Sequence, residues 1–388
     1  MKIVFTSGTA RGGTNLRTYG LRAHPNISLG IDAILPLFKY YRYRVLNPDS
    51  ANLLTLPKNW NDPLPDVFFN NQSLKDLQKI WATGENVTII DQHWDCLLPE
   101  IQKRTKLASP ELVDEMSGIV SNNFKQSIVN YLEIIDLKSQ KDNEIVGFNE
   151  NWVSEFFPNL KTLFPDAKFI HYIRDPRSVL FSSEFHEPDF KKHPAVFSMA
   201  RHVRKNMSLA MYFSSLDVFA KNYLITKYED CVVNLNQYSR NICDFLEINF
   251  AETMSDFLEF KLNENRLNGV FWETFVASVN CWREIVDSPL INAVEWLSQY
   301  EMRNYDYELV NKTPIITDRT ESFLLLNMAT SIGWSENKHD IQEQIKKEKA
   351  RFELLHDEIN AVNSVKNYNF QPKNYSTINI GMYGGECG

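Results

Sequence analysis

A glycine-rich segment near the N-terminus holds the first residues whose types and spacing could do chemistry: Ser7-Gly8-Thr9-Ala10-Arg11-Gly12-Gly13-Thr14-Asn15. It lies between an apolar run over Lys2–Thr6, which predicts a strand, and a helical pattern over Thr14–Ala23. Successive backbone N–H groups in such a turn, together with the positive end of the following helix, form an anion-binding site. Arg11 adds a cation inside the loop. The segment therefore predicts a site for a small anion.

The glycine spacing of this loop also matches the phosphate loop of nucleoside-triphosphate enzymes, GxxxxGK[ST]. Gly8 and Gly13 stand at the two glycine positions, but Thr14-Asn15 replaces the Lys-Ser/Thr pair. That pair would supply the lysine on the terminal phosphate and the hydroxyl for magnesium. A P-loop kinase is disfavoured for this reason, while a purely structural turn stays open at this point.

A second group of polar residues follows a later strand, predicted over Lys168–Ile173. Arg174-Asp175-Pro176 ends that strand before a helix over 177–185, so Arg174 stands where ligands bind in open α/β sheets. Ser182 lies about two turns along the helix, and helical side chains point back toward the N-terminus. A guanidinium and a hydroxyl can therefore converge on one phosphate. A capped helix start with an Arg174–Asp175 pair would give the same pattern.

Taken together, the two segments resemble the superfamily of sulfotransferases that use 3′-phosphoadenosine 5′-phosphosulfate (PAPS). The glycine-rich loop resembles the 5′-phosphosulfate loop of that family, and FPDAKFIHYIRDPRSVLFS (164–182) resembles its 3′-phosphate motif. Lys227-Tyr228-Glu229-Asp230, followed by 241–249, resembles a third family segment. The resemblance covers about residues 1–50 and 145–310. It implies an enzyme that moves a sulfuryl group from PAPS to a hydroxyl acceptor without a metal and releases adenosine 3′,5′-bisphosphate. A sugar, lipid, peptide or small metabolite could be the acceptor.

The resemblance also implies roles for single residues. The nucleotide-binding residues would be Arg11, Gly12, Gly13, Thr14, Asn15, Arg174, Ser182 and Tyr228. Arg11 would also be catalytic, because it would lie on the transferring group. Aligned without gaps from Arg11, Asp32 falls on the presumed glutamate base of the tyrosylprotein and related bacterial enzymes. A helix or turn cap is the alternative role of Asp32, and His93 is the rival base because some sulfotransferases use histidine.

One departure from the family pattern concerns a lysine that those enzymes carry before the 3′-phosphate motif. Asn149 stands at that position here. A cation on the transferring group would then be missing or come from elsewhere. The alternative function is therefore a non-catalytic nucleotide-binding protein with a sulfotransferase fold.

Strands alternating with helices predict an α/β, P-loop-like three-layer fold with a central, mainly parallel sheet flanked by helices. The further strands expected are Ile27–Leu29, Val87–Asp91 and Asn222–Lys227, and the further helices are Pro110–Asp136, Ser154–Phe164, Met199–Phe213 and Asn236–Leu246. The predicted sulfotransferase domain covers residues 1–335, with about 62–143 as an insertion or acceptor-facing cap. Residues 336–366 are expected to form an amphipathic helix that packs on its own domain or pairs in a homodimer, and 367–388 a loosely ordered tail.

Bulk composition limits the partners of this 388-residue chain. Its net charge of −8 argues against broad binding to nucleic acid or to anionic membranes. The basic stretch from Lys191-Lys192-His193 through Arg201, Arg204 and Lys205 is expected to be a solvated helix face, although it could assist the phosphates or an acidic acceptor. The five cysteines form no CxxC pair, and no stretch has the ~18–20 apolar residues of a membrane span. We therefore expect a cytoplasmic protein without a membrane span.

Overall fold

The structure is a computed structural model that describes residues 2–49, 71–83, 87–186, 196–267, 279–312 and 314–326, and also 52, 56–57, 60, 342–343, 345–346, 348–349 and 375–376. A parallel sheet with the strand order β2-β3-β1-β4-β5-β6 forms its centre. Its strands are β1 (Lys2–Ser7), β2 (Ile27–Ile31), β3 (Ile145–Asn149), β4 (Lys168–Ile173), β5 (Tyr223–Lys227) and β6 (Tyr375–Ser376). The predicted α/β fold class is confirmed.

The pairing register aligns the carboxyl ends of the strands along one edge of the sheet. Thr6 of β1 pairs with Asn149 on one side and with Ile170 on the other, and Ile31 of β2 pairs with Asn149. The segments that follow β1, β2, β3 and β4 therefore leave the sheet side by side. This edge is where an open parallel sheet places its ligand site.

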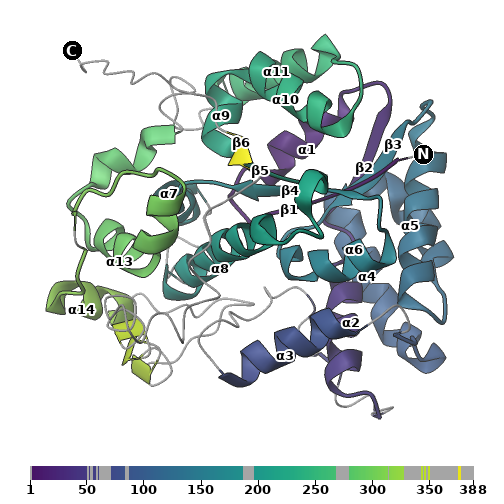
Figure 1. Ribbon diagram of the computed structural model, residues 1–388, viewed down its shortest axis with the longest axis horizontal. Helices are drawn as coiled ribbons and strands as arrows, with labels where there is room; N and C mark the ends of the chain where they lie inside the picture. The colour runs from purple at the N-terminus through teal and green to yellow at the C-terminus, as the bar shows by residue number, and fades with distance from the viewer. Residues whose placement is uncertain are drawn as a thin grey trace.

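Helices cover both faces of the sheet (Figure 1). On one face, Val4, Ile170 and Tyr172 belong to a core shared with α1 (Thr14–Arg22), α10 (Leu235–Leu246) and α11 (Glu252–Leu267). On the other face, Phe5, Phe148 and Phe169 join a larger core. The helices that contribute to that core are α2 (Leu35–Leu46), α3 (Asn71–Ala82), α4 (Trp94–Ala108), α5 (Phe124–Ser139), α6 (Phe157–Leu163), α7 (Pro176–His186), α8 (Val196–Ser215), α13 (Pro289–Asn304) and α14 (Asp318–Leu326). Burial on both faces explains why the strands read as continuous apolar runs.

Three local predictions differ from the structure. Strand β3 was not predicted, although it lies next to the central strand, because Gly147 interrupts a short apolar run. A Cβ at Gly147 would lie 1.7 Å from the carbonyl oxygen of Val4, so the approach of β1 requires a glycine there. The predicted strand Val87–Asp91 is wrong, since only Thr88 forms a bridge, to Asn123. The helical pattern over 110–136 is split into a 3₁₀ helix, η3 (Pro110–Ile119), and α5.

The basic positions on α8 also differ from expectation. Arg204 is 1% exposed and donates to Glu348 at 2.7 Å, and Lys205 is buried in an ion pair with Glu155. The predicted solvated helix face is therefore wrong for Arg204 and Lys205, because buried carboxylates partner both cations. The start of this basic stretch, Lys191-Lys192-His193, lies outside the described residues.

The C-terminal predictions fall largely outside the described residues. Within 336–366, Ile345 is 1% exposed and belongs to the larger core. Within 367–388, Tyr375–Ser376 form β6, which pairs with Ile225 and Thr226 of β5. In the part of the chain that the structure describes, no helix is long and apolar enough to cross a membrane.

Candidate functional site

The loop between β1 and α1 is a tight turn with left-handed backbone. Arg11 has a φ of 60° and Gly13 a φ of 74°, and the Gly12 N–H donates to the Thr9 carbonyl at 3.0 Å. A Cβ at Gly13 would lie 2.2 Å from the Tyr228 ring, so the loop backbone passes directly against that ring. Gly13 is also the N-cap of α1, and no side chain caps this helix. The first turn of α1 therefore keeps its N–H groups for an anion.

Arg17, which the sequence interpretation did not single out, holds this loop in place. Its guanidinium donates to the carbonyl of Gly12 at 2.7 Å and to that of Thr226 at 3.0 Å. It also lies over the Tyr172 ring, 4.2 Å from the centroid, and is 1% exposed. A fully buried arginine is unusual, and nothing in the sequence around Arg17 indicated its burial. Arg17 therefore links the anion loop to the ends of β4 and β5.

Four of the predicted nucleotide-binding residues meet above this loop. Arg174, at the end of β4, donates from Nη1 to the Arg11 carbonyl at 2.8 Å. The Arg11 guanidinium donates to Ser182 Oγ at 3.1 Å from Nη2 and 3.3 Å from Nε. The Arg174 guanidinium lies over the Tyr228 ring, 4.2 Å from its centroid. The structure thus brings together side chains from three separate segments. We call this group, which consists of Arg11, Arg174, Ser182 and Tyr228, the rim of the loop. Of the remaining loop positions, Thr14 is buried and Asn15 is exposed.

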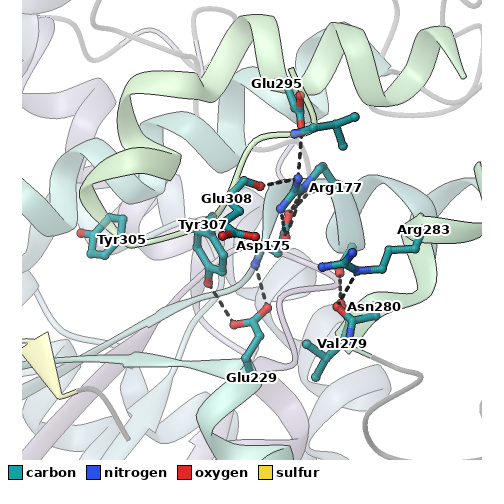
Figure 2. Close-up of polar contacts among 12 residues, drawn as sticks. Asp175, Arg177, Glu229, Val279, Asn280, Arg283, Glu295, Tyr305, Tyr307 and Glu308 are labelled. Carbon is teal, nitrogen blue, oxygen red and sulfur yellow. Dashed lines mark hydrogen bonds and ion pairs between the residues drawn. The ribbon is translucent and has the colours of Figure 1, made fainter. Parts of the chain in front are cut away.

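A buried ion-pair network fixes the turn that carries Arg174 (Figure 2). Asp175 accepts from the Arg177 backbone N–H at 2.8 Å and thereby caps α7. The Arg177 guanidinium bonds to Asp175 at 2.7 Å and to Glu295 of α13 at 2.8 Å. Glu229 accepts from the Asp175 N–H and from the Tyr307 hydroxyl, each at 2.9 Å. Asp175 therefore caps α7 and forms an ion pair with Arg177. Arg174, in the same turn, contacts the loop.

Asp32 lies at the same edge, directly after β2. Its φ of 45° is left-handed, and Asn151 holds its carboxylate through the backbone N–H at 2.8 Å and through Nδ2 at 2.7 Å. Trp152, the next residue, donates its N–H to the Gly8 carbonyl at 3.0 Å, so the segment after β3 connects Asp32 with the anion loop. Burial raises the pKa of Asp32, while the Arg104 guanidinium and the bonds from Asn151 oppose that rise.

Comparison with known families gives a match between residues 4–252 and the profile described as the Sulfotransferase family. This match covers more than half of the chain. The protein belongs to the sulfotransferase family.

Three solved structures resemble the chain of this sulfotransferase at low identity. The sulfotransferase domain of the Synechococcus PCC 7002 olefin synthase is 17% identical, with a TM-score of 0.39, and the match covers 73% of this chain and 87% of that one. The sulfotransferase domain from the curacin biosynthetic pathway is 14% identical, with a TM-score of 0.43 and coverages of 79% and 98%. Sulfotransferase STF9 from Mycobacterium avium is 13% identical, with a TM-score of 0.38 and coverages of 80% and 78%. No curated protein matches the chain.

Two further predicted positions of the sulfotransferase are fully buried. His93 is 0% exposed, and its Nδ1 lies 2.9 Å from the Tyr40 hydroxyl, between α2 and α4. Asn149 is also 0% exposed and accepts a hydrogen bond from Thr6 Oγ1 at 3.0 Å. It stands at the end of β3, beside the central strand that leads into the anion loop. Asn149 therefore supplies an amide, and no charge, at this position.

Proposed function

We propose that this sulfotransferase moves the sulfuryl group of PAPS to a hydroxyl acceptor. The observation that carries the proposal is the meeting of Arg11, Arg174, Ser182 and Tyr228 above the uncapped end of α1. PAPS carries a phosphosulfate at the 5′ position and a phosphate at the 3′ position of its ribose. A rim that combines a helix N-terminus with two guanidinium groups suits a ligand with anionic groups at two positions.

Each part of the rim has a separate role in this proposal. The N–H groups of the loop from Gly12 to Asn15, with Arg11 and Thr14, bind the 5′-phosphosulfate. Arg174 and Ser182 bind the 3′-phosphate, and Tyr228 lines the adenosine pocket. In the structure Ser182 Oγ accepts from Arg11. A serine hydroxyl has one O–H donor besides its acceptor lone pairs, so Ser182 can keep this contact and donate to a phosphate oxygen.

PAPS supplies the sulfuryl group and a leaving bisphosphate. The acceptor hydroxyl gives its proton to the Asp32 carboxylate as its oxygen forms a bond to sulfur. The bond between sulfur and the 5′-phosphate oxygen breaks, and its electron pair stays on that oxygen. Arg11 and the loop N–H groups stabilise this negative charge, which is how positioning and electrostatics accelerate related transfers.

The buried state of His93 favours Asp32 as the base. His93 is 0% exposed and bonded to Tyr40, whereas the Asp32 side chain keeps 14% of its surface exposed. A base must come within hydrogen-bond reach of the acceptor hydroxyl. Asp32 can be reached from the sheet edge, and it adjoins the anion loop through Asn151 and Trp152.

Calorimetry with the purified chain tests the nucleotide assignment. We expect adenosine 3′,5′-bisphosphate to bind without magnesium and ATP with magnesium to bind far more weakly. Arg174→Ala removes a guanidinium from the rim and should weaken bisphosphate binding by about 10- to 100-fold, since charged hydrogen bonds contribute roughly 1.5–3 kcal/mol. The matched control is Arg240→Ala, because Arg240 is exposed on α10 and bonds to Asn236. Equal binding of ATP and bisphosphate would contradict the proposal.

Transfer itself separates an enzyme from the non-catalytic alternative that Asn149 raises. Incubation with sulfur-labelled PAPS and an extract of the source cells should label an acceptor, which mass spectrometry then identifies. A chain that binds the bisphosphate tightly but labels nothing above the level of Arg11→Ala would be a nucleotide-binding protein without activity.

A further inference from the structure

A charged cluster surrounds Asp32, and one of its members comes from a part of the chain that the sequence resemblance does not cover. Arg104, on α4, lies between two carboxylates. Its Nη2 is 3.0 Å from Glu150 Oε1 and 3.7 Å from Asp32 Oδ1. The exposed side-chain fractions are 16% for Arg104, 14% for Asp32 and 1% for Glu150. One guanidinium therefore joins a partly accessible carboxylate to a fully buried one.

Glu150 is held as an anchor for this guanidinium. Its Oε2 accepts from the Ile34 backbone N–H at 2.7 Å, at the N-terminus of α2. Its Oε1 accepts from Arg104 Nε at 3.3 Å as well as from Nη2. Both oxygens of Glu150 are thus occupied by donors. This arrangement fixes the direction of the Arg104 side chain, because a buried carboxylate with three donors has little freedom to rotate.

The helix that carries Arg104 is fastened to the strand that carries Asp32. Ser109 follows α4 and is 0% exposed. Its hydroxyl donates to the Ile31 carbonyl at 2.9 Å and accepts from the Ile31 N–H at 3.0 Å. Ile31 directly precedes Asp32. The end of α4 is therefore fixed at the last residue of β2, which sets the distance between Arg104 and Asp32.

We propose that Arg104 is a positioning residue that keeps Asp32 in the ionised form able to accept a proton, with Glu150 as its buried anchor. The proposal rests on the proposed role of Asp32 as the base. It also gives the α4 region a function, since this segment supplies the counter-ion of the base. A carboxylate close to an opposite charge stays ionised more readily than burial alone would allow.

The electrostatic surroundings of Asp32 agree with this role. In the described chain, Asp32 interacts with Arg104 of α4, with Glu150 after β3 and with Tyr131 of α5. Burial raises the pKa of Glu150 to about 8, and Arg104 opposes that rise. Burial holds the pKa of Tyr131 well above its usual range, so this phenol stays neutral. Arg104 is then the cation that favours the ionised form of Asp32.

Carbon-13 NMR of the full chain, labelled at aspartate carboxyl groups, tests the proposal without knowledge of the acceptor. The spectrum of Asp32→Asn assigns the Asp32 signal. In Arg104→Met, Asp32 should titrate at higher pH, and the ratio of ionised to protonated Asp32 at a given acidic pH should fall about tenfold or more. Arg104→Lys keeps the charge and should titrate nearly as the wild-type chain does. Arg104→Gln replaces Arg104→Met if the latter does not fold.

Glu150→Gln is the control that distinguishes the effect of the Arg104 charge on Asp32 from the effect of looser packing around Asp32. Burial raises the pKa of Glu150 to about 8, so this side chain is already neutral at the acidic pH at which Asp32 titrates, and the substitution leaves the charge unchanged there. Asp32 should therefore titrate at the wild-type pH. An unchanged titration of Asp32 in Arg104→Met, or in Arg104→Gln where that variant replaces it, would overturn the proposal. A rise in the titration pH of Asp32 that is as large in Glu150→Gln as in Arg104→Met would also overturn it, because looser packing alone would then explain both results. Bisphosphate binding, measured in parallel, should stay within about threefold in all four variants, since none touches the nucleotide rim. If the wild-type chain bound no bisphosphate, the proposed function would fail while the titration of Asp32 could still be compared.

Discussion

Gly13→Ala tests whether the observed loop conformation is the one that binds the nucleotide. The added methyl group would lie 2.2 Å from Cδ2 of Tyr228, and the residue would have to keep a φ of 74°. A left-handed conformation costs an L-residue about 1–2 kcal/mol. The ring must also move, which disrupts the contact between Tyr228 and the Arg174 guanidinium, 4.2 Å from the ring centroid. Such a contact contributes about 0.5–2 kcal/mol.

Together these terms predict a loss of about 1.5–4 kcal/mol, or roughly 10-fold to several hundred-fold in bisphosphate affinity. Isothermal calorimetry measures this loss directly. The matched control is Gly118→Ala, because a Cβ at Gly118 would meet nothing closer than Ile134 Cδ1 at 3.4 Å. The control should bind like the wild-type chain.

A double variant isolates the clash from the backbone strain. Removing the ring in Gly13→Ala/Tyr228→Ala relieves the overlap, so the double variant should bind at least about fivefold more tightly than the two single losses multiplied together predict. Wild-type affinity of Gly13→Ala would refute the reasoning, since the loop could then bind the nucleotide in another conformation.

Three further predictions follow from buried or strained groups. Arg17→Met removes the guanidinium that donates to the carbonyls of Gly12 and Thr226. We expect the free energy of unfolding to fall by about 3 kcal/mol or more and bisphosphate binding to weaken. Wild-type stability in urea unfolding would contradict this. Asp32→Asn should slow transfer by about 10²–10⁴-fold with bisphosphate affinity unchanged, whereas His93→Gln should lose far less; the reverse order in labelled-PAPS assays would make His93 the base. Burial lowers the pKa of His171 to about 4. Between about pH 6.5 and 4 the unfolded chain therefore binds a proton at His171 that the folded chain does not, and the free energy of unfolding falls with the pH by up to about 3 kcal/mol. The urea midpoint of His171→Gln should change less between pH 7 and 5 than that of the wild-type chain.

The sheet and the convergence of the candidate site residues were predictable where the sequence carries a local signal. Lys168–Ile173 was predicted with the bounds that the structure shows, because an apolar run ends at Arg174-Asp175-Pro176. The convergence of Arg11 and Arg174 follows from their places after two adjacent parallel strands. Strand β3 was missed because Gly147 breaks its pattern, and only the tertiary approach of Val4 explains that glycine.

The electrostatic partners of the site had no comparable signal. Arg104 stands within an ordinary charged helix, and nothing in its neighbouring residues distinguishes it from Lys103 or Lys106. Its contact with Glu150 spans 46 positions. Arg17 likewise reads as a surface residue until the fold buries it. Long-range partners of buried charges are set by packing, which periodicity and motif spacing do not encode.

The ion-pair network around Arg177 limits how far the chain can be truncated at its C-terminal side. The family match ends at residue 252, but Arg177 bonds to Glu295, and Tyr307 bonds to Glu229. A fragment that stops at 252 would leave a guanidinium in the interior with one carboxylate in place of two, and removing one partner of a buried ion pair costs about 3–5 kcal/mol. The shortest expressible unit that keeps the turn from Arg174 to Arg177 intact should therefore extend at least to Asn311, whose N–H also bonds to Glu295.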